Sequence, residues 1–448
     1  MLMNLAQPYS TRPSKPYDSL LDFDSAQCED LLFDKQEEVE IRCRAGVRSV
    51  SLHWTLSRNL FRQPFLSGDA EALPANRFLI HIPSSKLRPG FFDIHVSLDD
   101  GESAPIDGIC TFGFKVNEMP LPINRPADFT EFWARAKREL SQIPLAAEQG
   151  NVRKFSSAEI NAYNLAHASL PADYDPTGHR CEEVEAFKVG FNSVKAMRIR
   201  GWLAKPPGSG PFPAMLVLPG AGFNPRPIPL EQARHGFLAL DIQVHGQDVD
   251  QATYERPPMS LGDKLFDPPD ANYNRCIYLN ELQGVNYLAS RPDVDKTRIV
   301  VVGGSQGGGG AVVVAALDPR IAAVVAGIPF FGDRPYVKWS ESANAANPPI
   351  DGMDRDGPPA LPNTSEGRGL PYYDVMNFAP DVRCPTMMNA GLIDPTSSPT
   401  SVFVIYRSIG STDKRFVPLP GLGHDWSAEF DREAWRWLDQ VLKLSPKM

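Results

Sequence analysis

Short runs that alternate apolar and polar residues fill the first part of the chain, from about residue 29 to residue 116. Alternation with a period of two is typical of strands that bury one face. The runs lie at 39–43, 50–54, 78–82, 92–96 and 110–114, and turn signals such as Arg88-Pro89-Gly90 separate them. Because no helical periodicity lies between the runs, this spacing predicts a small antiparallel sandwich of immunoglobulin type, which defines a fold and no function.

From residue 182 onward the pattern changes to strands that alternate with helices. Nearly continuous apolar runs, as expected of strands buried on both faces, lie at 214–218, 237–242, 299–302, 323–326, 386–389 and 416–419. Helix-like stretches lie at 277–288, 308–317, 401–408 and 428–444. In the last stretch Phe430, Ala434 and Leu438 fall near one face, so we expect that helix to cover the sheet. The pattern predicts an α/β fold with a mostly parallel sheet.

A proline-rich segment at 120–126 separates the two patterns, and Phe129 and Trp133 open a helix that extends to about residue 140. We place the domain boundary in this segment. The expected organisation is an N-terminal tail over residues 1–28, a β-sandwich domain over 29–119 and an α/β domain over 120–448.

Composition restricts the class of protein. The chain has 448 residues, of which 42% are hydrophobic and 22% charged, and these values exclude a disordered or fibrous chain. With 45 Lys and Arg against 54 Asp and Glu, the net charge is −9, which argues against a nucleic-acid partner held by phosphate contacts.

Residues 1–10 lack a basic region and an apolar stretch, so we predict no secretory signal, although removal of a signal would leave the same pattern. The compartment stays open. The uncharged window 299–317 is long enough for a membrane span, but six glycines around Ser305 and Gln306 favour a strand, a tight turn and a helix. We therefore predict no membrane segment.

Six cysteines are scattered along the chain without a Cys-x-x-Cys pair, which argues against a zinc ribbon or a thioredoxin-like site. Cys43 and Cys110 lie in two strand-like runs and could form a disulfide across the sandwich. Sequence spacing does not determine that pairing.

The most specific motif is Gly303-Gly304-Ser305-Gln306-Gly307, between the strand at 299–302 and the small-residue stretch at 308–317. A Gly-x-Ser-x-Gly turn in this context exposes the serine Oγ on a strained elbow, next to a helix N-terminus that favours an oxyanion. A purely structural turn is the alternative. A phosphate-binding loop fits poorly, since the lysine of a P-loop is absent. We interpret Ser305 as a nucleophile.

A nucleophilic serine needs a base, and the base needs an acid that fixes its tautomer. Asp394 follows a late strand-like run, and His424 follows the next one in a glycine-flanked loop. The order serine, aspartate, histidine is that of α/β-hydrolases. An N-capping role is the alternative for Asp394, with Asp425 and Asp374 as the other candidate acids.

The second part of an oxyanion hole is expected in the loop after the first core strand, at 219–223. Its small residues leave backbone N–H groups accessible. We expect the amide of Ala221 or Gly222 to act together with the amide of Gln306, whereas an ordinary glycine turn is the alternative.

These motifs bring out a family resemblance. From about residue 127 to the C-terminus the chain resembles carbohydrate esterase family 7, the acetyl xylan esterase and cephalosporin C deacetylase family. His245-Gly246-Gln247 matches the family's Arg-Gly-Gln triplet, and the elbow Gly-x-Ser-Gln-Gly-Gly and the acid segment Gly-Leu-x-Asp are matched at 303–308 and 391–394. Further matching segments lie at 125–129, 132–133, 201–206 and 210–214.

The resemblance implies an α/β-hydrolase fold over residues 120–448, with Ser305, His424 and Asp394 as the catalytic triad. It implies a serine carboxylesterase that removes O-acetyl groups from acetylated sugars or xylo-oligosaccharides. The reaction needs neither a metal nor an organic cofactor, and the expected partner is a small acetylated carbohydrate, without nucleic acid or membrane.

Four features depart from the family pattern. His245 replaces the arginine of the triplet, which supports loops under the site; Asp425 replaces a glutamate after the histidine; and Ala221 replaces a tyrosine in the oxyanion loop. The N-terminal sandwich is an addition, which could hinder the ring-shaped hexamer typical of the family or position a polysaccharide. A homo-oligomer therefore stays open.

Two alternatives remain for the function. A serine peptidase of the prolyl-oligopeptidase type shares the order of the triad and a Gly-Gly-Ser-x-Gly-Gly elbow, but about 90 residues of sandwich are too few for its propeller. A catalytically decayed carbohydrate-binding protein would keep the fold without activity.

Overall fold

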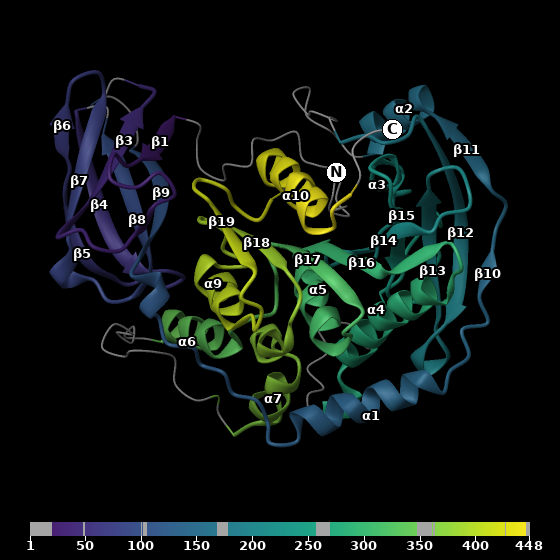
Figure 1. The fold of residues 1–448 in the computed structure, drawn as a ribbon. Coiled ribbons are helices and arrows are strands. Elements are labelled where there is room, and N and C mark those ends of the chain that lie inside the picture. The colour runs from purple at the N-terminus through teal and green to yellow at the C-terminus, as the bar shows by residue number, and fades with distance from the viewer. Residues whose placement is uncertain are drawn as a thin grey trace.

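The computed structural model describes residues 20–47, 50–99, 101, 105–167, 178–256, 269–346, 361, 363–425 and 427–444. Within these ranges, two small sheets of N-terminal strands pack against each other at one side of a large sheet that helices cover on both faces (Figure 1). This arrangement confirms the predicted α/β fold and the all-β sandwich that precedes it.

The sandwich consists of a four-stranded and a five-stranded sheet. The first contains β1 (Leu21–Asp24), β3 (Glu38–Ala45), β7 (Arg77–Pro83) and β6 (Glu71–Leu73), and the second contains β2 (Leu32–Phe33), β9 (Ile106–Phe114), β8 (Gly90–Asp99), β4 (Ser51–Arg58) and β5 (Pro64–Asp69). The predicted runs correspond to β3, β4, β7, β8 and β9. Because β1 pairs with β3, the strands of the sandwich begin before the predicted boundary at residue 29.

In the described part of the chain, the large sheet has ten strands and is parallel from β15 to β19. In spatial order it contains β10 (Glu148–Gln149), β12 (Glu183–Asn192), β13 (Arg198–Lys205), β15 (Leu238–Gln243), β14 (Phe212–Leu218), β16 (Val294–Gly304), β17 (Ile321–Gly327), β18 (Thr386–Gly391) and β19 (Lys414–Leu419), with β11 (Arg153–Ser156) beside β12. All pairs from β15 to β19 are parallel, whereas β10 to β13 add an antiparallel edge.

Alternate residues of the core strands face two separate helical layers. Leu216 of β14 packs into the core under α4 and α5, whereas Met215 and Val217 pack on the other face with Phe430 and Leu438 of α10. This double burial explains the continuous apolar runs in the sequence. The helices are α1 (Phe129–Ser141), α2 (Ser157–His167), α3 (Leu230–Arg234), α4 (Tyr273–Ser290), α5 (Gln306–Leu317), α6 (Arg334–Ala345), α7 (Ser365–Gly369), α8 (Val375–Phe378), α9 (Pro399–Ser408) and α10 (Ala428–Val441).

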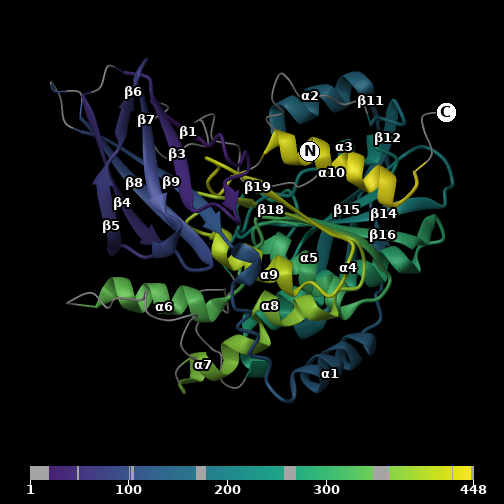
Figure 2. The same ribbon diagram turned by 60° about the vertical axis from the view of Figure 1, so that its left-hand side comes forward.

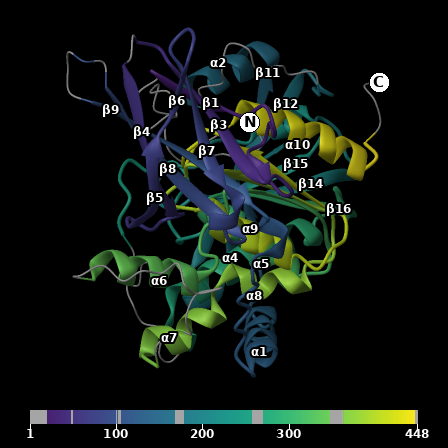
Figure 3. The same ribbon diagram turned by 90° about the vertical axis from the view of Figure 1, so that its left-hand side faces the viewer.

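The sandwich stands over α6 and beside α9, as Figures 2 and 3 show from two sides. The two parts share one hydrophobic core, in which the rings of Phe91 and Phe403 lie 5.8 Å apart. A side-chain hydrogen bond of 2.9 Å from Thr400 to Asn59 crosses the same boundary. The sandwich is therefore packed against the helical layer rather than tethered by a linker alone.

Two smaller expectations concern the cysteines and the membrane. Cys43 and Cys110 both carry free thiols, so the structure contains no bridge between them. Within the part of the chain that the structure describes, every helix is too short or too polar to span a bilayer.

Candidate active site

Ser305 lies on the sharp turn between β16 and α5. Its backbone has φ 56° and ψ −119°, a conformation that L-residues with a side chain rarely adopt. Two amides, those of Gly309 and Phe330, donate to the Ser305 carbonyl at 3.0 and 2.9 Å, and the Ser305 amide donates to Gly327 at 3.0 Å. These bonds hold the strained turn in place, as the elbow motif predicts.

The glycines around the elbow are required by close backbone contacts. A Cβ on Gly303 would lie 2.4 Å from the carbonyl oxygen of Gly307, and a Cβ on Gly307 would lie 2.4 Å from that of Leu218. On Gly308 the corresponding distance to the Gly327 oxygen is 2.5 Å. No side chain fits at these separations, so the spacing of glycines follows from the packing of α5 against β14 and β17.

The structure brings Ser305, His424 and Asp394 into one hydrogen-bonded chain. The Nε2 atom of His424 lies 2.9 Å from the Ser305 Oγ, and its Nδ1 atom lies 2.8 Å from Asp394 Oδ2. Since a carboxylate only accepts, Nδ1 carries the proton and Nε2 is free to accept one from the serine. The Asp394 side chain is fully buried, whereas that of His424 is 28% exposed.

Backbone amides fix the orientation of Asp394. Its Oδ1 accepts hydrogen bonds from the amides of Thr396 at 2.7 Å and Ser397 at 2.9 Å, which leaves Oδ2 for His424. The alternative acid Asp374 instead accepts from the backbone amides of Asp333, Arg334 and Met376. The bond from Met376 caps α8. Sequence analysis did not assign a role to Thr396 and Ser397, although an aspartate followed by proline and small polar residues is a signal for such a turn.

The loop after β14 lies against the elbow, where the oxyanion amides are expected. The carbonyl oxygens of Leu218 and Pro219 face Gly307, and a Cβ on Gly220 would lie 3.7 Å from the Gly304 oxygen. Ala221 follows directly and is exposed. Gln306 begins α5, so its amide is one of the first-turn donors that have no partner inside the helix. These positions fit an oxyanion role for the amides of Gln306 and Ala221.

His245 supports that loop from behind. Its ring lies 4.6 Å from the ring of Phe223, its Nδ1 atom lies 3.0 Å from the Tyr273 hydroxyl, and it forms a hydrogen bond with the backbone of Gly222. Burial lowers the pKa of His245 to about 4, against an opposing effect of the Gly222 bond. The imidazole that replaces the family's arginine is therefore neutral at pH 7. No local sequence pattern predicts the contact between His245 and Tyr273, because the two residues lie 28 positions apart along the chain.

A second buried acid lies beneath the elbow helix. Glu281 of α4 is fully buried against Gly310 of α5, where a Cβ would meet its carboxylate at 2.5 Å. Within the described ranges neither carboxylate oxygen has a hydrogen-bond partner. Burial raises the pKa of Glu281 well above its usual range, because the ionised carboxylate would lie in the core without a hydrogen-bond partner.

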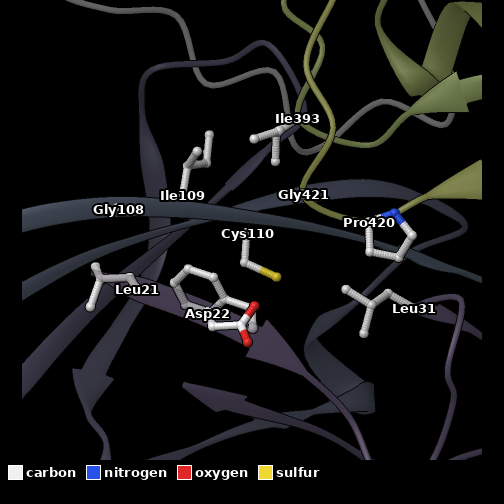
Figure 4. Close-up of a pocket in the computed structure, with 10 residues that line it drawn as sticks. Leu21, Asp22, Leu31, Gly108, Ile109, Cys110, Ile393, Pro420 and Gly421 are labelled. Carbon is white, nitrogen blue, oxygen red and sulfur yellow. The ribbon is translucent and has the colours of Figure 1, made fainter. Parts of the chain in front are cut away.

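The sandwich contacts the loops that carry the acid and the histidine. A cavity of about 70 Å³ lies between them. Figure 4 shows the residues that line it. Ile393, which precedes Asp394, and Pro420 form one wall of the cavity, and Leu21 and Cys110 of the sandwich form another. The added domain thus borders the back of the site.

Known proteins match this chain over most of its length. The family model of acetyl xylan esterase (AXE1) matches residues 164–441. The acetyl esterase Axe7A of Xylanibacter ruminicola is 25% identical over 394 residues, which cover 85% of this chain and 81% of that protein.

Two solved structures share the fold. An acetyl xylan esterase from Paenibacillus sp. R4 is 26% identical, with a TM-score of 0.54 over 72% of this chain and 97% of that one. Acetyl xylan esterase 1 from Thermoanaerobacterium sp. JW/SL YS485 is 23% identical, with a TM-score of 0.53 over 73% and 98%. The family resemblance predicted from the motifs is confirmed: since the matched region exceeds half of its length, the chain belongs to the acetyl xylan esterase family and is a carboxylic ester hydrolase.

Proposed function

We propose that the protein removes O-acetyl groups from acetylated sugars or xylo-oligosaccharides through an acyl-enzyme on Ser305. One observation carries the mechanism: the continuous chain from Ser305 Oγ through both nitrogens of His424 to the buried carboxylate of Asp394. Membership of the acetyl xylan esterase family supports the choice of an acetyl ester as substrate.

In the first half of the reaction, Ser305 Oγ attacks the acetyl carbonyl carbon while His424 Nε2 accepts the hydroxyl proton. The negative charge on the carbonyl oxygen is stabilised by the amides of Gln306 and Ala221, aided by the N-terminus of α5. The C–O bond to the sugar then breaks, and His424 donates its proton to the departing sugar oxygen. Ser305 is left acetylated.

In the second half, water takes the place of the sugar. His424 removes a proton from the water as its oxygen attacks the acetyl carbon, and the proton then returns to Ser305 Oγ as acetate leaves. Throughout, Asp394 keeps the proton on Nδ1 and stabilises the imidazolium that forms. The chain's own residues supply every proton transfer.

The test is acetate release from acetylated xylo-oligosaccharides, beside hydrolysis of p-nitrophenyl acetate, butyrate and octanoate. Ser305→Ala should lower kcat on the order of 10⁶-fold, as removal of a triad serine does elsewhere. Ser141→Ala, which changes an exposed serine at the end of α1, is the matched control and should retain full activity. An esterase that tolerates Ser305→Ala would show that the nucleophile is another residue.

The choice of ester tests the substrate class separately from the nucleophile. Activity that falls steeply beyond the acetyl group supports a small acyl pocket. Turnover of long esters, or of peptides alone, would contradict the deacetylase proposal while leaving the elbow intact. A fluorophosphonate probe that fails to label Ser305 would instead support a decayed site.

A further inference from the structure

A buried cluster of two histidines and a glutamate lies apart from the triad. His179 precedes β12, Glu231 lies on α3, and His235 is the residue that ends α3. The three residues are 7%, 4% and 2% exposed. One nitrogen or oxygen atom from each lies within 4.8 Å of the others. These are the ligand types that zinc and neighbouring transition metals prefer.

The Glu231 carboxylate lies at the centre of the cluster. Its Oε1 atom is hydrogen-bonded to His179 Nε2 and lies 3.6 Å from His235 Nε2. Two ligands at about 2.0 to 2.1 Å from a tetrahedral zinc ion lie roughly 3.3 Å apart, so the second separation is close to that of a metal site. The first is a hydrogen bond in this structure, so metal binding would require His179 Nε2 and Glu231 Oε1 to move apart.

Glu231 is also held from outside the cluster. The side-chain amide of Asn164 on α2 donates to its other oxygen, Oε2, at 2.9 Å. Metal-binding carboxylates are commonly oriented by such a bond.

His235 provides the independent indication of a ligand. Within the described part of the chain, neither of its ring nitrogens makes a hydrogen bond, although both are buried. The ring is also fixed, since it stacks on Trp435 of α10 at 3.7 Å with an interplanar angle of 3°. Burial of an imidazole without a hydrogen-bond partner costs folding free energy. A metal ion would bind the ring nitrogen that faces Glu231.

We propose that His179, Glu231 and His235 bind one divalent transition-metal ion, with zinc as the best match to two imidazoles and a carboxylate. To bind metal, His179 needs an Nε2 atom without a proton, so any proton on that atom moves to Nδ1 or to solvent, and three protein ligands then surround the metal.

The position of the cluster assigns a structural role to this site. His235 precedes β15, whereas Ser305 follows β16, and both strands are parallel to β14. The metal would therefore lie at the amino ends of the parallel strands, whereas Ser305 lies at their carboxyl ends. At the amino ends α2, α3 and α10 come together (Figure 2). Bound metal would fasten the segment that carries His179, just before β12, to α3 without entering the reaction. This inference therefore does not depend on the proposed function.

Zinc binding to the chelator-treated full chain tests the proposal. Calorimetry and metal analysis should find one zinc equivalent in the wild type. His179→Gln and His235→Phe should each weaken binding about 100-fold or more, because each removes a direct ligand. His235→Phe keeps a flat ring on Trp435. Asn164→Ala should weaken binding about 10- to 100-fold.

His81→Ala is the matched control, because His81 forms a partly exposed cluster with Glu38 and Glu40 that could also attract a cation. This variant should bind zinc as the wild type does. Zinc should raise the Tm of the wild type and of His81→Ala, since a ligand that binds only the folded state stabilises it. Magnesium should not, because it prefers oxygen ligands.

The wild type alone can overturn the proposal if it takes up no zinc and its Tm does not respond. In that case the cluster is an ion pair beside a neutral histidine. Stoichiometric binding that survives both His179→Gln and His235→Phe, or is lost in His81→Ala, would place the metal elsewhere. Chelation should lower Tm while leaving kcat/KM for p-nitrophenyl acetate unchanged; a loss of activity at unchanged Tm would refute the structural role.

Discussion

Asp394→Asn separates the electronic role of the acid from its structural one. In the native site, Oδ1 accepts two backbone amides and Oδ2 accepts the His424 Nδ1 proton. An asparagine keeps its oxygen on the two amides, so its NH₂ group faces Nδ1. Two donors cannot share that contact, and His424 must move its proton to Nε2. The Nε2–H then points at Ser305 Oγ, 2.9 Å away, and cannot accept the hydroxyl proton.

The expected loss is large because the base is held in the wrong tautomer. The corresponding change in a serine protease lowers kcat by about 10⁴, which is roughly 5.5 kcal/mol of transition-state stabilisation. Stability should change little, since the two amide bonds remain. Asp394→Ala should lose both activity and about 1–3 kcal/mol of stability, because two amides lose their acceptor. Steady-state kinetics with p-nitrophenyl acetate and thermal unfolding measure the two effects.

Asp425→Asn is the matched control, as it changes the carboxylate next to His424 in sequence and should retain most of the activity. The reasoning fails if Asp394→Asn keeps more than about a tenth of the wild-type kcat/KM. It also fails if Asp425→Asn shows the large loss instead. Either result would assign the acid of the triad to another residue.

Three other predictions concern packing and pH. Gly307→Ala should lower Tm through an overpacking cost of about 1–3 kcal/mol or more, whereas Gly220→Ala should not, because its Cβ would lie 3.7 Å from the nearest atom. If the two variants had the same Tm, the close packing of Gly307 at the elbow would be contradicted. The pKa of His245 is about 4 in the folded chain, below the usual 6.5. Between pH 4 and pH 6.5 the histidine is therefore protonated more in the unfolded chain than in the folded one. About 3 kcal/mol of stability should therefore be lost as pH falls from 6.5 to 4, and unfolding at several pH values should show a weaker dependence in His245→Gln. The pKa of Glu281 is raised in the folded chain, so the stability of the wild type falls as pH rises above 4.5. The Tm of Glu281→Gln should therefore exceed that of the wild type by a margin that grows with pH. A margin that stays constant with pH would show that Glu281 is ionised in the folded chain.

The parts of the site that depend on local sequence could be predicted. Ser305 lies in a turn whose glycines are imposed by contacts within the elbow and with adjacent strands. Asp394 follows the buried strand β18, and His424 follows β19, the edge strand beside it. The carboxyl ends of these parallel strands lie together, so the meeting of the two residues follows from the topology.

The remaining features depend on contacts between distant segments. His179 and Glu231 are 52 residues apart, and neither lies in a pattern typical of a metal site. Tyr273 reaches His245 only because α4 packs beneath the sheet. The antiparallel strands β12 and β13 were not predicted as strands, since they are partly exposed and lack a continuous apolar run.

The core shared by the sandwich and α9 has a consequence for biosynthesis. The sandwich leaves the ribosome first. The side-chain amide of Asn59 can donate to Asp93 within the sandwich, but its side-chain oxygen must wait for the Thr400 hydroxyl, 341 residues later. At about 5–20 residues per second this interval is roughly 17–70 s, during which the aromatic face around Phe91 has no cover. The nascent sandwich is thus a natural client for chaperones, and its expression without the C-terminal half should yield aggregates rather than a soluble module.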